Sequence, residues 1–354
     1  MIKIKSKLKR LILIITSIIV SIPLVIIPAV TVVVYEIIFN RRFETPEWAE
    51  LDVSEFEGLT LEECEFSSYK GKTLKGYKYS SKGVNVKGVA VFSHGMGGGH
   101  NTYLPMIDYI SKMGYLVFAY DATGCNESEG GGVRGLPQGI ADLDLALDFV
   151  AEDDDYNKLP VVLIGHSWGA YSVGNVLGDH PEVKSAVMIS GFSSSDDLIY
   201  QYGYDIFGFA TDFMASYVYL YEDIKFGDYA DFDAVSSLKN SNATIMIVYS
   251  DDDDIIEKEN GYDVFYREFS DNSRFKFVNY TNRGHGKIYC SDSANEYKKE
   301  LEEAYEKYIE FNKLSDTDKR FNAYMQTNID KKRYFELDYQ LMNDIIDMFD
   351  MACK

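Results

Sequence analysis

Cysteine and histidine are scarce in this chain, which has four cysteines and five histidines among its 354 residues. The cysteines are far apart, and no C-x-x-C pair or His/Cys spacing typical of a metal site occurs. We therefore expect no metal centre. A location outside the cytoplasm would permit disulfides, but scattered cysteines do not require them. The four are Cys64, Cys125, Cys290 and Cys353.

Positive charge is also in short supply. The chain has 35 Lys and Arg against 56 Asp and Glu, which gives a formal net charge of −21. Residues 1–40 hold five of the cations and one of the anions, so residues 41–354 carry −25. Such a surface repels nucleic acid and anionic lipid headgroups, and neither is expected as a partner. A neutral small-molecule ester fits this charge better, although acidity of this kind also keeps a domain soluble.

The N-terminus has a different character. Five cations within the first ten residues precede Leu11 to Tyr35, a run of 25 residues without charge. At 1.5 Å per residue this run spans roughly 37 Å, more than a hydrocarbon core of ~30 Å requires. The run is too long for a signal-peptide core, and no A-x-A-like cleavage site follows it. We predict a basic cytoplasmic tail over residues 1–10 and a transmembrane signal anchor over 11–39.

The cations of the tail also predict an orientation. Because Lys and Arg favour the cytoplasmic side, we expect a single-pass protein of the cell membrane whose main domain lies outside the cytoplasm. Arg41 and Arg42, on the far side of the run, weaken this orientation slightly. The membrane is thus an expected partner through the N-terminal helix.

The rest of the chain alternates strand-like apolar runs with helical patterns. From residue 63 to 354 this alternation predicts an α/β domain with a mostly parallel central sheet flanked by helices. A polar stretch over 40–62 is interpreted as a linker. Two segments break the rhythm, an aromatic-rich one at about 193–242 and a charged helical insertion at about 292–332. A terminal helix is predicted at about 334–351.

One short segment carries most of the functional signal. Residues 161–170 read VVLIGHSWGA, four apolar residues that run into a G-x-S-x-G turn and then into small residues that can open a helix. A turn of this kind lifts the hydroxyl of Ser167 to where a base can reach it. A structural serine in a tight turn is the alternative, but the preceding strand favours a nucleophile.

A serine nucleophile needs a base, and the chain order narrows the choice. After a turn of this type the acid comes next along the chain and the histidine last. Among the five histidines only His285 lies far enough downstream. It stands between two glycines, just after the strand-like residues 275–280. We predict His285 as the base.

The acid is expected after another core strand. The strand-like residues 244–249 are followed by four consecutive aspartates at 251–254. Like charges repel, so one carboxylate should turn inward towards His285 while the others stay solvated or cap a helix. We favour Asp253, and Asp252 and Asp254 remain alternatives.

A second glycine-rich turn follows the strand-like residues 89–92. It reads SHGMGGGH over 93–100, and its glycines leave backbone N–H groups free. We predict that the N–H groups of Met96 and Trp168 form an oxyanion hole, since one donor follows the nucleophile and one comes from this turn. A phosphate-binding loop is disfavoured, because no Lys-Ser/Thr pair follows.

These motifs resemble the α/β-hydrolase superfamily, and within it the monoacylglycerol lipase and serine aminopeptidase-like branch. The resemblance covers roughly residues 74–286 and a terminal helix. It implies Asp253 as the acid, since the acid normally stands three residues after the small residue that ends the strand. Ser250 and Asn126 stand where many relatives have glycine. The features that carry the resemblance are HGMGGG at 94–99, the segment 121–130, GHSWGA at 165–170, the aspartate cluster and Gly284-His285-Gly286.

The resemblance also implies a cap over the active site at 193–242. Aromatic side chains crowd this segment, and we hypothesise that some of them line an acyl pocket. Tyr204, Phe207 and Phe213 are the candidate substrate-binding residues. The alternative is an aromatic stripe that only packs the cap onto the sheet.

Together these features predict a membrane-anchored serine hydrolase that cleaves lipid or short acyl esters. Ser167, His285 and Asp253 would act through an acyl-enzyme, and no cofactor is needed. A serine aminopeptidase or a thioesterase on the same fold is the alternative. A non-catalytic binding protein that kept the fold is a further one.

Overall fold

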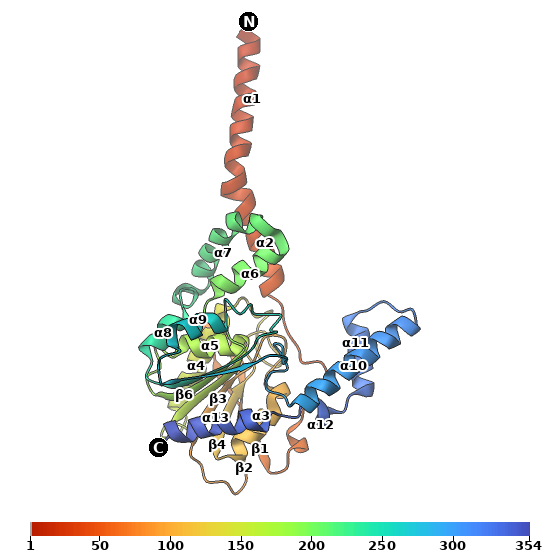
Figure 1. Ribbon diagram of the computed structural model, residues 1–354. Helices are drawn as coiled ribbons and strands as arrows, with labels where there is room; N and C mark the ends of the chain where they lie inside the picture. The colour runs from red at the N-terminus through yellow and green to blue at the C-terminus, as the bar shows by residue number, and fades with distance from the viewer. Residues whose placement is uncertain (1) are drawn as a thin grey trace.

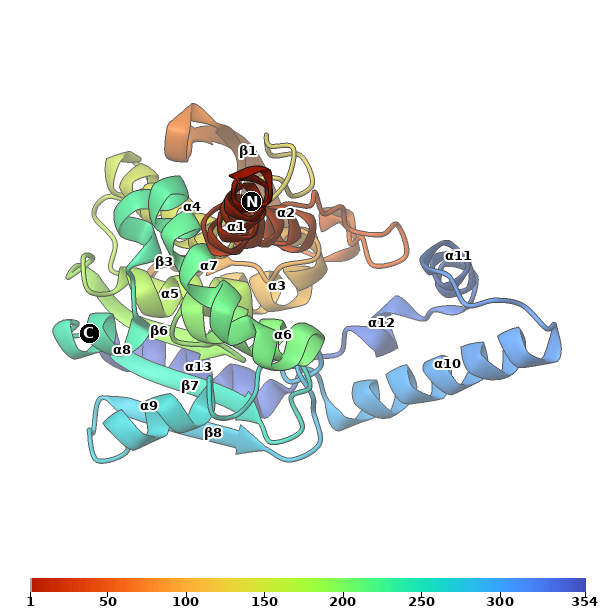
Figure 2. The ribbon, with the colours of Figure 1, turned by 90° about the horizontal axis from the view of Figure 1, so that it is seen from above.

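The computed structural model describes the backbone of residues 2–354 and the side chains of residues 7–354. Its body is a sheet covered by helices, and a long N-terminal helix rises from one end of that body (Figure 1). A helical arm leaves the body on a different side, as the view from above makes plain (Figure 2).

The sheet has eight strands in the order β1-β2-β4-β3-β5-β6-β7-β8. The β1–β2 and β2–β4 pairs are antiparallel, and every pair from β4 to β8 is parallel. The mostly parallel α/β sheet that the sequence predicts is therefore confirmed. The strands are β1 Leu59–Ser67, β2 Thr73–Ser81, β3 Gly88–Ser93, β4 Tyr115–Tyr120, β5 Val161–His166, β6 Val183–Ile189, β7 Thr244–Ser250 and β8 Phe275–Tyr280.

Helices cover both faces of this sheet. Two helices pack on one face and four on the other, so the central strands are buried on both sides. Burial on both faces is why β3 and β5 are continuous apolar runs rather than alternating ones. The first face holds α3 Leu104–Lys112 and α13 Tyr339–Ala352; the second holds α4 Pro137–Glu152, α5 Trp168–Val176, α8 Ala234–Asn240 and α9 Tyr262–Phe269.

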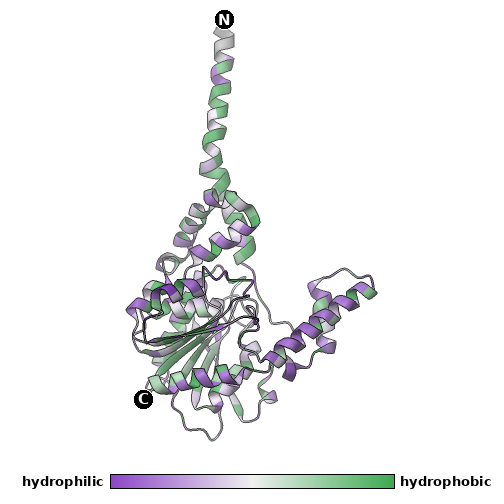
Figure 3. Ribbon diagram, viewed as in Figure 1, coloured by the Kyte–Doolittle hydropathy of each residue, from purple (hydrophilic) through white to green (hydrophobic). Residues whose placement is uncertain are grey.

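The N-terminal helix is continuous but changes geometry in its middle. α1 Ile2–Ser21 passes through a π-helical turn, η1 Ile22–Ile26, into α2 Ile27–Phe39. Pro23 lies in that turn and Pro28 just after it; each lacks a backbone N–H, a local reason for the altered bonding. Residues Lys7–Phe39 are long and apolar enough to cross a membrane. In Figure 3 this helix stands out as the apolar projection from the body.

The last turns of this helix are packed against protein. One face of α2 contacts the helix α7 Thr211–Phe226, and Thr31, Tyr35 and Phe39 are buried there. The hydroxyl of Tyr35 donates to Glu222 Oε1 at 2.5 Å, and the Lys225 ammonium pairs with Glu36. The anchor predicted over 11–39 therefore includes about nine residues that form part of the body on one face.

The segment expected to be a linker, 40–62, is also docked. Phe43 forms a β-bridge with Cys125, and the Arg42 guanidinium donates to the carbonyl oxygens of Ser128 and Gly130 at 3.0 and 2.9 Å. β1 begins at Leu59, within the expected linker, because its polar sequence pairs along an edge of the sheet rather than packing in the core.

The cap is shorter than the sequence suggests. It consists of α6 Ser195–Phe207, a short 3-10 turn, α7 and a second 3-10 turn that ends at Ala230. α8 does not belong to it, since Ala234 and Leu238 pack into the core beside α5. The cap therefore ends near residue 230 instead of 242.

The charged insertion forms the arm that leaves the body. α10 Asp292–Phe311 and α11 Asp318–Asn328 build most of it, and α12 Lys331–Tyr334 leads back (Figure 2). The terminal helix α13 begins at Tyr339 rather than near 334. Asp338 sets this start, because its side chain accepts from the N–H groups of Gln340 and Leu341 and caps the helix.

The contact between α2 and the cap can be tested by stability. Tyr35→Ala removes a buried ring and leaves the Glu222 carboxylate without its donor, so we expect a loss of about 3 kcal/mol in the free energy of unfolding. Ile37→Ala is the matched control, since Ile37 is 66% exposed on the same helix, and it should cost less than about 0.5 kcal/mol. Unfolding of the full chain in detergent, followed by near-ultraviolet circular dichroism, measures both. Equal losses would contradict the docking of α2.

Candidate active site

The G-x-S-x-G turn joins β5 to α5. Ser167 has φ 54° and ψ −117°, a strained backbone that points its side chain away from both elements. The flanking glycines are needed for space. A Cβ on Gly165 would lie 2.4 Å from the Gly169 carbonyl oxygen, and one on Gly169 would lie 2.0 Å from that of Ser93. The sharp turn therefore holds only if both positions lack a side chain.

Ser167, His285 and Asp253 meet at the carboxyl ends of the parallel strands. The His285 Nε2 atom lies 2.7 Å from Ser167 Oγ, and His285 Nδ1 lies 2.8 Å from Asp253 Oδ2. The Asp253 side chain is fully buried, and that of His285 is nearly so. Asp253 Oδ1 also accepts from the N–H groups of Ile255 and Ile256 at 3.0 and 2.9 Å. These bonds hold the carboxylate in place, and the carboxylate orients the imidazole.

The structure separates the four consecutive aspartates by their partners. The Asp251 carboxylate pairs with Lys258, whose hydrogen bond holds the pKa of Asp251 below its usual range. Asp252 accepts from the N–H groups of Arg283 and Gly284 at 3.1 and 2.9 Å, so it braces the loop that carries the histidine. Asp254 is exposed. Of the four, Asp253 alone is hydrogen-bonded to the imidazole.

Met96 and Trp168 follow neighbouring strands at the same edge of the sheet. β3 and β5 are parallel, with Ser93 opposite Gly165, so the two turns begin side by side. Trp168 is the first residue of α5, and its N–H is one of those that a helix leaves without an intrahelical partner. The Trp168 side chain is fixed separately, because its indole N–H donates to the carbonyl oxygen of Leu136 at 2.8 Å. The two backbone N–H groups predicted for an oxyanion hole are thus carried by adjacent turns.

Two residues that sequence reasoning did not assign connect these loops. His166 Nε2 donates to the backbone oxygen of His285 at 3.0 Å, and His166 Nδ1 lies 2.9 Å from the Tyr103 hydroxyl. That hydroxyl accepts from the Gly95 N–H at 3.2 Å. Burial lowers the pKa of His166 to about 3, so its ring is neutral at ordinary pH and can both donate and accept. The sequence signal for His166 was its position inside the G-x-S-x-G turn, next to Ser167.

Two further histidines, His94 and His100, hold the glycine-rich turn in place. Asp121 Oδ1 accepts from the backbone N–H of His100 at 3.0 Å and lies 2.9 Å from its Nδ1. Burial acts to raise the pKa of Asp121, but the neighbouring His100 outweighs it and holds that pKa at about 2. His94 is buried and bonds to the Gly95 carbonyl oxygen and the Ala122 N–H. These residues brace the turn that carries Met96.

An open polar cleft of about 690 Å³ lies beside His285. The loop 282–287 forms one wall, and α10 forms another with Asn295, Lys298 and Lys299. The side of the molecule that carries His285 therefore faces the root of the arm.

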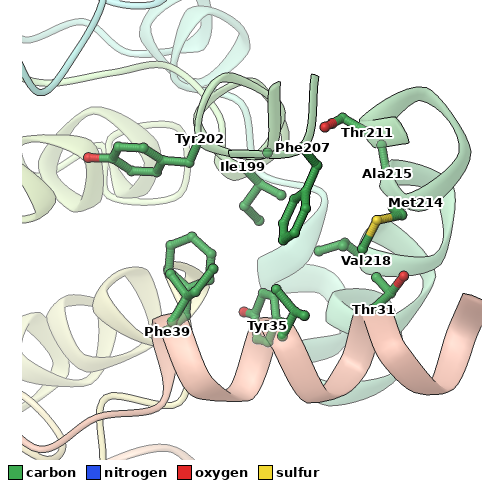
Figure 4. A pocket seen from close by; sticks show the side chains of 13 residues that line it. Thr31, Tyr35, Phe39, Ile199, Tyr202, Phe207, Thr211, Met214, Ala215 and Val218 are labelled. Carbon is green, nitrogen blue, oxygen red and sulfur yellow. The ribbon is translucent and has the colours of Figure 1, made fainter. Parts of the chain in front are cut away.

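The three aromatic residues predicted to line an acyl pocket lie apart from the triad. Phe207 points into an apolar cavity between α2 and the cap, together with Tyr35 and Phe39 (Figure 4). No triad residue lines that cavity. Tyr204 and Phe213 do not line it either and are 54% and 65% exposed. Helices α6 and α7 turn two of the three rings outward, and the role of all three in binding substrate stays a prediction.

Comparison with known proteins agrees with this architecture. The solved Pyrococcus furiosus esterase Pf2001 superposes with a TM-score of 0.55 at 15% identity, over 77% of this chain and 98% of that one. The chain thus has the α/β-hydrolase fold. Residues 84–219, less than half of the chain, match the family described as serine aminopeptidase, S33.

Curated relatives match over shorter stretches. The uncharacterized protein YfhR of Escherichia coli K12 is 27% identical over 141 residues, which is 38% of this chain and 49% of that protein. Protein ABHD8 of Homo sapiens is 33% identical over 113 residues, 32% of this chain and 25% of that protein. The chain thus aligns with about half the length of one relative and a quarter of the other.

The aspartate series gives a direct test of the assigned acid. Asp253→Asn should lower the rate of ester cleavage about 10⁴-fold, because the imidazole loses the acceptor that selects its tautomer. Asp254→Asn is the matched control one residue away and should stay within about twofold, since its side chain is exposed. Steady-state kinetics of the purified variants measure both. A larger loss at Asp254 than at Asp253 would contradict the assignment.

Proposed function

We propose that this protein is a membrane-anchored serine hydrolase that cleaves carboxylic esters through an acyl-enzyme. One observation carries the proposal: the imidazole of His285 lies between the Ser167 hydroxyl, at 2.7 Å, and the Asp253 carboxylate, at 2.8 Å. Nucleophile, base and orienting acid are thus within hydrogen-bond reach of one another, as this chemistry requires. The fold and the G-x-S-x-G turn support the same reaction class.

The reaction follows from that geometry. Ser167 Oγ bonds to the ester carbonyl carbon while His285 Nε2 takes its proton, and Asp253 stabilises the resulting imidazolium. The N–H groups of Met96 and Trp168 hold the oxyanion of the tetrahedral intermediate. The bond to the alkoxy group then breaks as His285 returns the proton to the leaving alcohol. Water attacks the acyl-enzyme by the same steps in reverse, releases the acid and restores the serine.

The packing of α2 supports an anchor that is retained. Cleavage of a signal sequence after the apolar run would remove Thr31, Tyr35 and Phe39 from contacts in which they are buried. It would also leave the Glu222 carboxylate without the hydroxyl that it accepts from. With the basic tail in the cytoplasm, the hydrolase domain lies outside the cell membrane in this proposal.

Esters are favoured over amino-terminal peptides by the charges near the site. A serine aminopeptidase needs a carboxylate free to bind the substrate amine. Asp251 is paired with Lys258, and Asp252 is bonded to the loop that carries His285. Asp253 is bonded to the imidazole, so Asp254 is the one of the four left for that role. Lys299 lies in the same cleft and would oppose binding of an amine.

Labelling with a fluorophosphonate probe tests the nucleophile. The full chain in detergent should form an adduct on the peptide that contains Ser167, and Ser167→Ala should abolish the adduct and lower turnover by at least about 10⁴-fold. Ser172→Ala is the matched control, since its hydroxyl is buried in the same helix and bonds to the Trp168 carbonyl. Labelling that persists in Ser167→Ala would end the proposal.

A substrate panel then tests the class. Acyl esters, acyl thioesters and aminoacyl arylamides are compared by kcat/KM on the wild-type chain. Esters are expected to be best, and faster cleavage of aminoacyl arylamides would replace the esterase by a peptidase.

A further inference from the structure

The corner between α6 and α7 exposes a cluster of apolar side chains at the top of the cap. Phe209 is 76% exposed and Phe213 is 65% exposed, values that are unusual for phenylalanine in water. Several exposed large apolar side chains at one corner of a fold are typical of an interaction site. We name it the cap apex, and it consists of Tyr204, Ile206, Phe209 and Phe213.

The cap apex lies beside the anchor where the anchor leaves the body. Figure 1 shows α6 and α7 beside α2 at the end of the body from which α1 rises, and α2 and α7 are in contact. The Tyr217 hydroxyl donates to the Pro23 carbonyl oxygen at 2.7 Å, and Thr211 and Thr31 line the same cavity. The cap therefore reaches along the anchor to about residue 23.

The length of the anchor sets how deep that contact lies in a bilayer. The cations of the tail stop at Arg10, so the hydrocarbon begins near Leu11. A core of ~30 Å then ends about 20 residues later, near Val30, at 1.5 Å per residue. Pro23 falls about 10 Å inside that boundary by the same rise per residue. Because the cap touches the anchor there, its apex must lie within the membrane surface as well.

The charges of the cap select the kind of bilayer. Lys225 is the one basic residue between 195 and 230, and its ammonium is paired with Glu36. Asp205 and Asp212 flank the apex and are exposed, which limits its depth and disfavours anionic headgroups. The surface that fits an apolar apex with an acidic rim is that of a zwitterionic phospholipid bilayer.

We propose that the cap apex is inserted into a zwitterionic bilayer, so that the hydrolase faces the membrane and takes its ester from it. This proposal rests on the proposed function for the ester, whereas the insertion itself rests on the anchor and the cap. The substrate class becomes a neutral acyl ester dissolved in the bilayer rather than one dissolved in water.

Fluorescence quenching tests the insertion without any need for activity. The full chain is placed in phosphatidylcholine nanodiscs with and without doxyl-labelled phosphatidylcholine. Tryptophan is introduced as Phe209→Trp at the apex or as Phe311→Trp on the arm, where the side chain is 86% exposed. The signal of wild type, which has two tryptophans, is subtracted. We expect at least twofold quenching of the Phe209→Trp signal and none for Phe311→Trp.

Equal quenching at the two positions would overturn the insertion. Quenching at Phe209→Trp is also expected to fall when the discs contain phosphatidylglycerol. Stronger quenching in those discs would overturn the choice of a zwitterionic surface.

Kinetics test whether the ester comes from the bilayer. Phe209→Asp should lower cleavage of a monoacyl ester held in the discs at least tenfold, while cleavage of a short water-soluble ester stays within twofold. Phe311→Asp should change neither rate. Equal rates for Phe209→Asp and wild type on the disc-held ester would contradict the route.

The two proposals fail in different ways. A quenched apex in a wild-type chain that cleaves no ester would leave the insertion standing and end the proposed function. Ester cleavage by a chain whose Phe209→Trp signal is not quenched would leave the proposed function standing and end the insertion.

Discussion

The hydrogen bonds of one imidazole connect most of the elements that matter for chemistry here. His285 contacts Ser167 through Nε2 and Asp253 through Nδ1, while its backbone oxygen accepts from His166. These partners come from the G-x-S-x-G turn, the loop after β7 and the end of β5, and Tyr103 extends the connection to the glycine-rich turn. The parallel sheet is what brings these loops to one edge. Displacing any of the loops would therefore alter the position of the ring.

The N-terminal helix and the cap form a second unit. Tyr35 is buried in α2 and donates to Glu222 in α7, so part of the N-terminal helix completes the surface of the α/β domain. In the proposed membrane setting, this contact fixes how the domain is held relative to the bilayer. A flexible linker would allow any orientation, whereas the docked segment 40–58 and the buried face of α2 favour one. Tethering and substrate access would then have the same structural cause.

The sequence carries local patterns well and long-range contacts poorly. The apolar runs of β3 to β8, the G-x-S-x-G turn and the position of His285 after a strand are each visible in a few consecutive residues. Asp253 could be preferred over its neighbours only through the strand that precedes it. The bond from His166 to the backbone of His285 joins residues 119 positions apart and leaves no mark in the local sequence pattern. The docking of α2 did leave a weak signal in the sequence, because Thr31, Tyr35 and Phe39 recur every four residues. Two of the three, Thr31 and Tyr35, carry hydroxyl groups within an otherwise apolar run.

Direct observation of the acyl-enzyme is the measurement that tests the central claim. The full chain would be mixed with an excess of an acyl ester, quenched with acid during turnover, digested and analysed by mass spectrometry. The account predicts that the peptide containing Ser167 gains the mass of the acyl group. It also predicts that Ser167 is acylated faster when Asp253 and His285 are intact than when either is replaced. Turnover with no acylated Ser167, or with the acyl group on another residue, would contradict it.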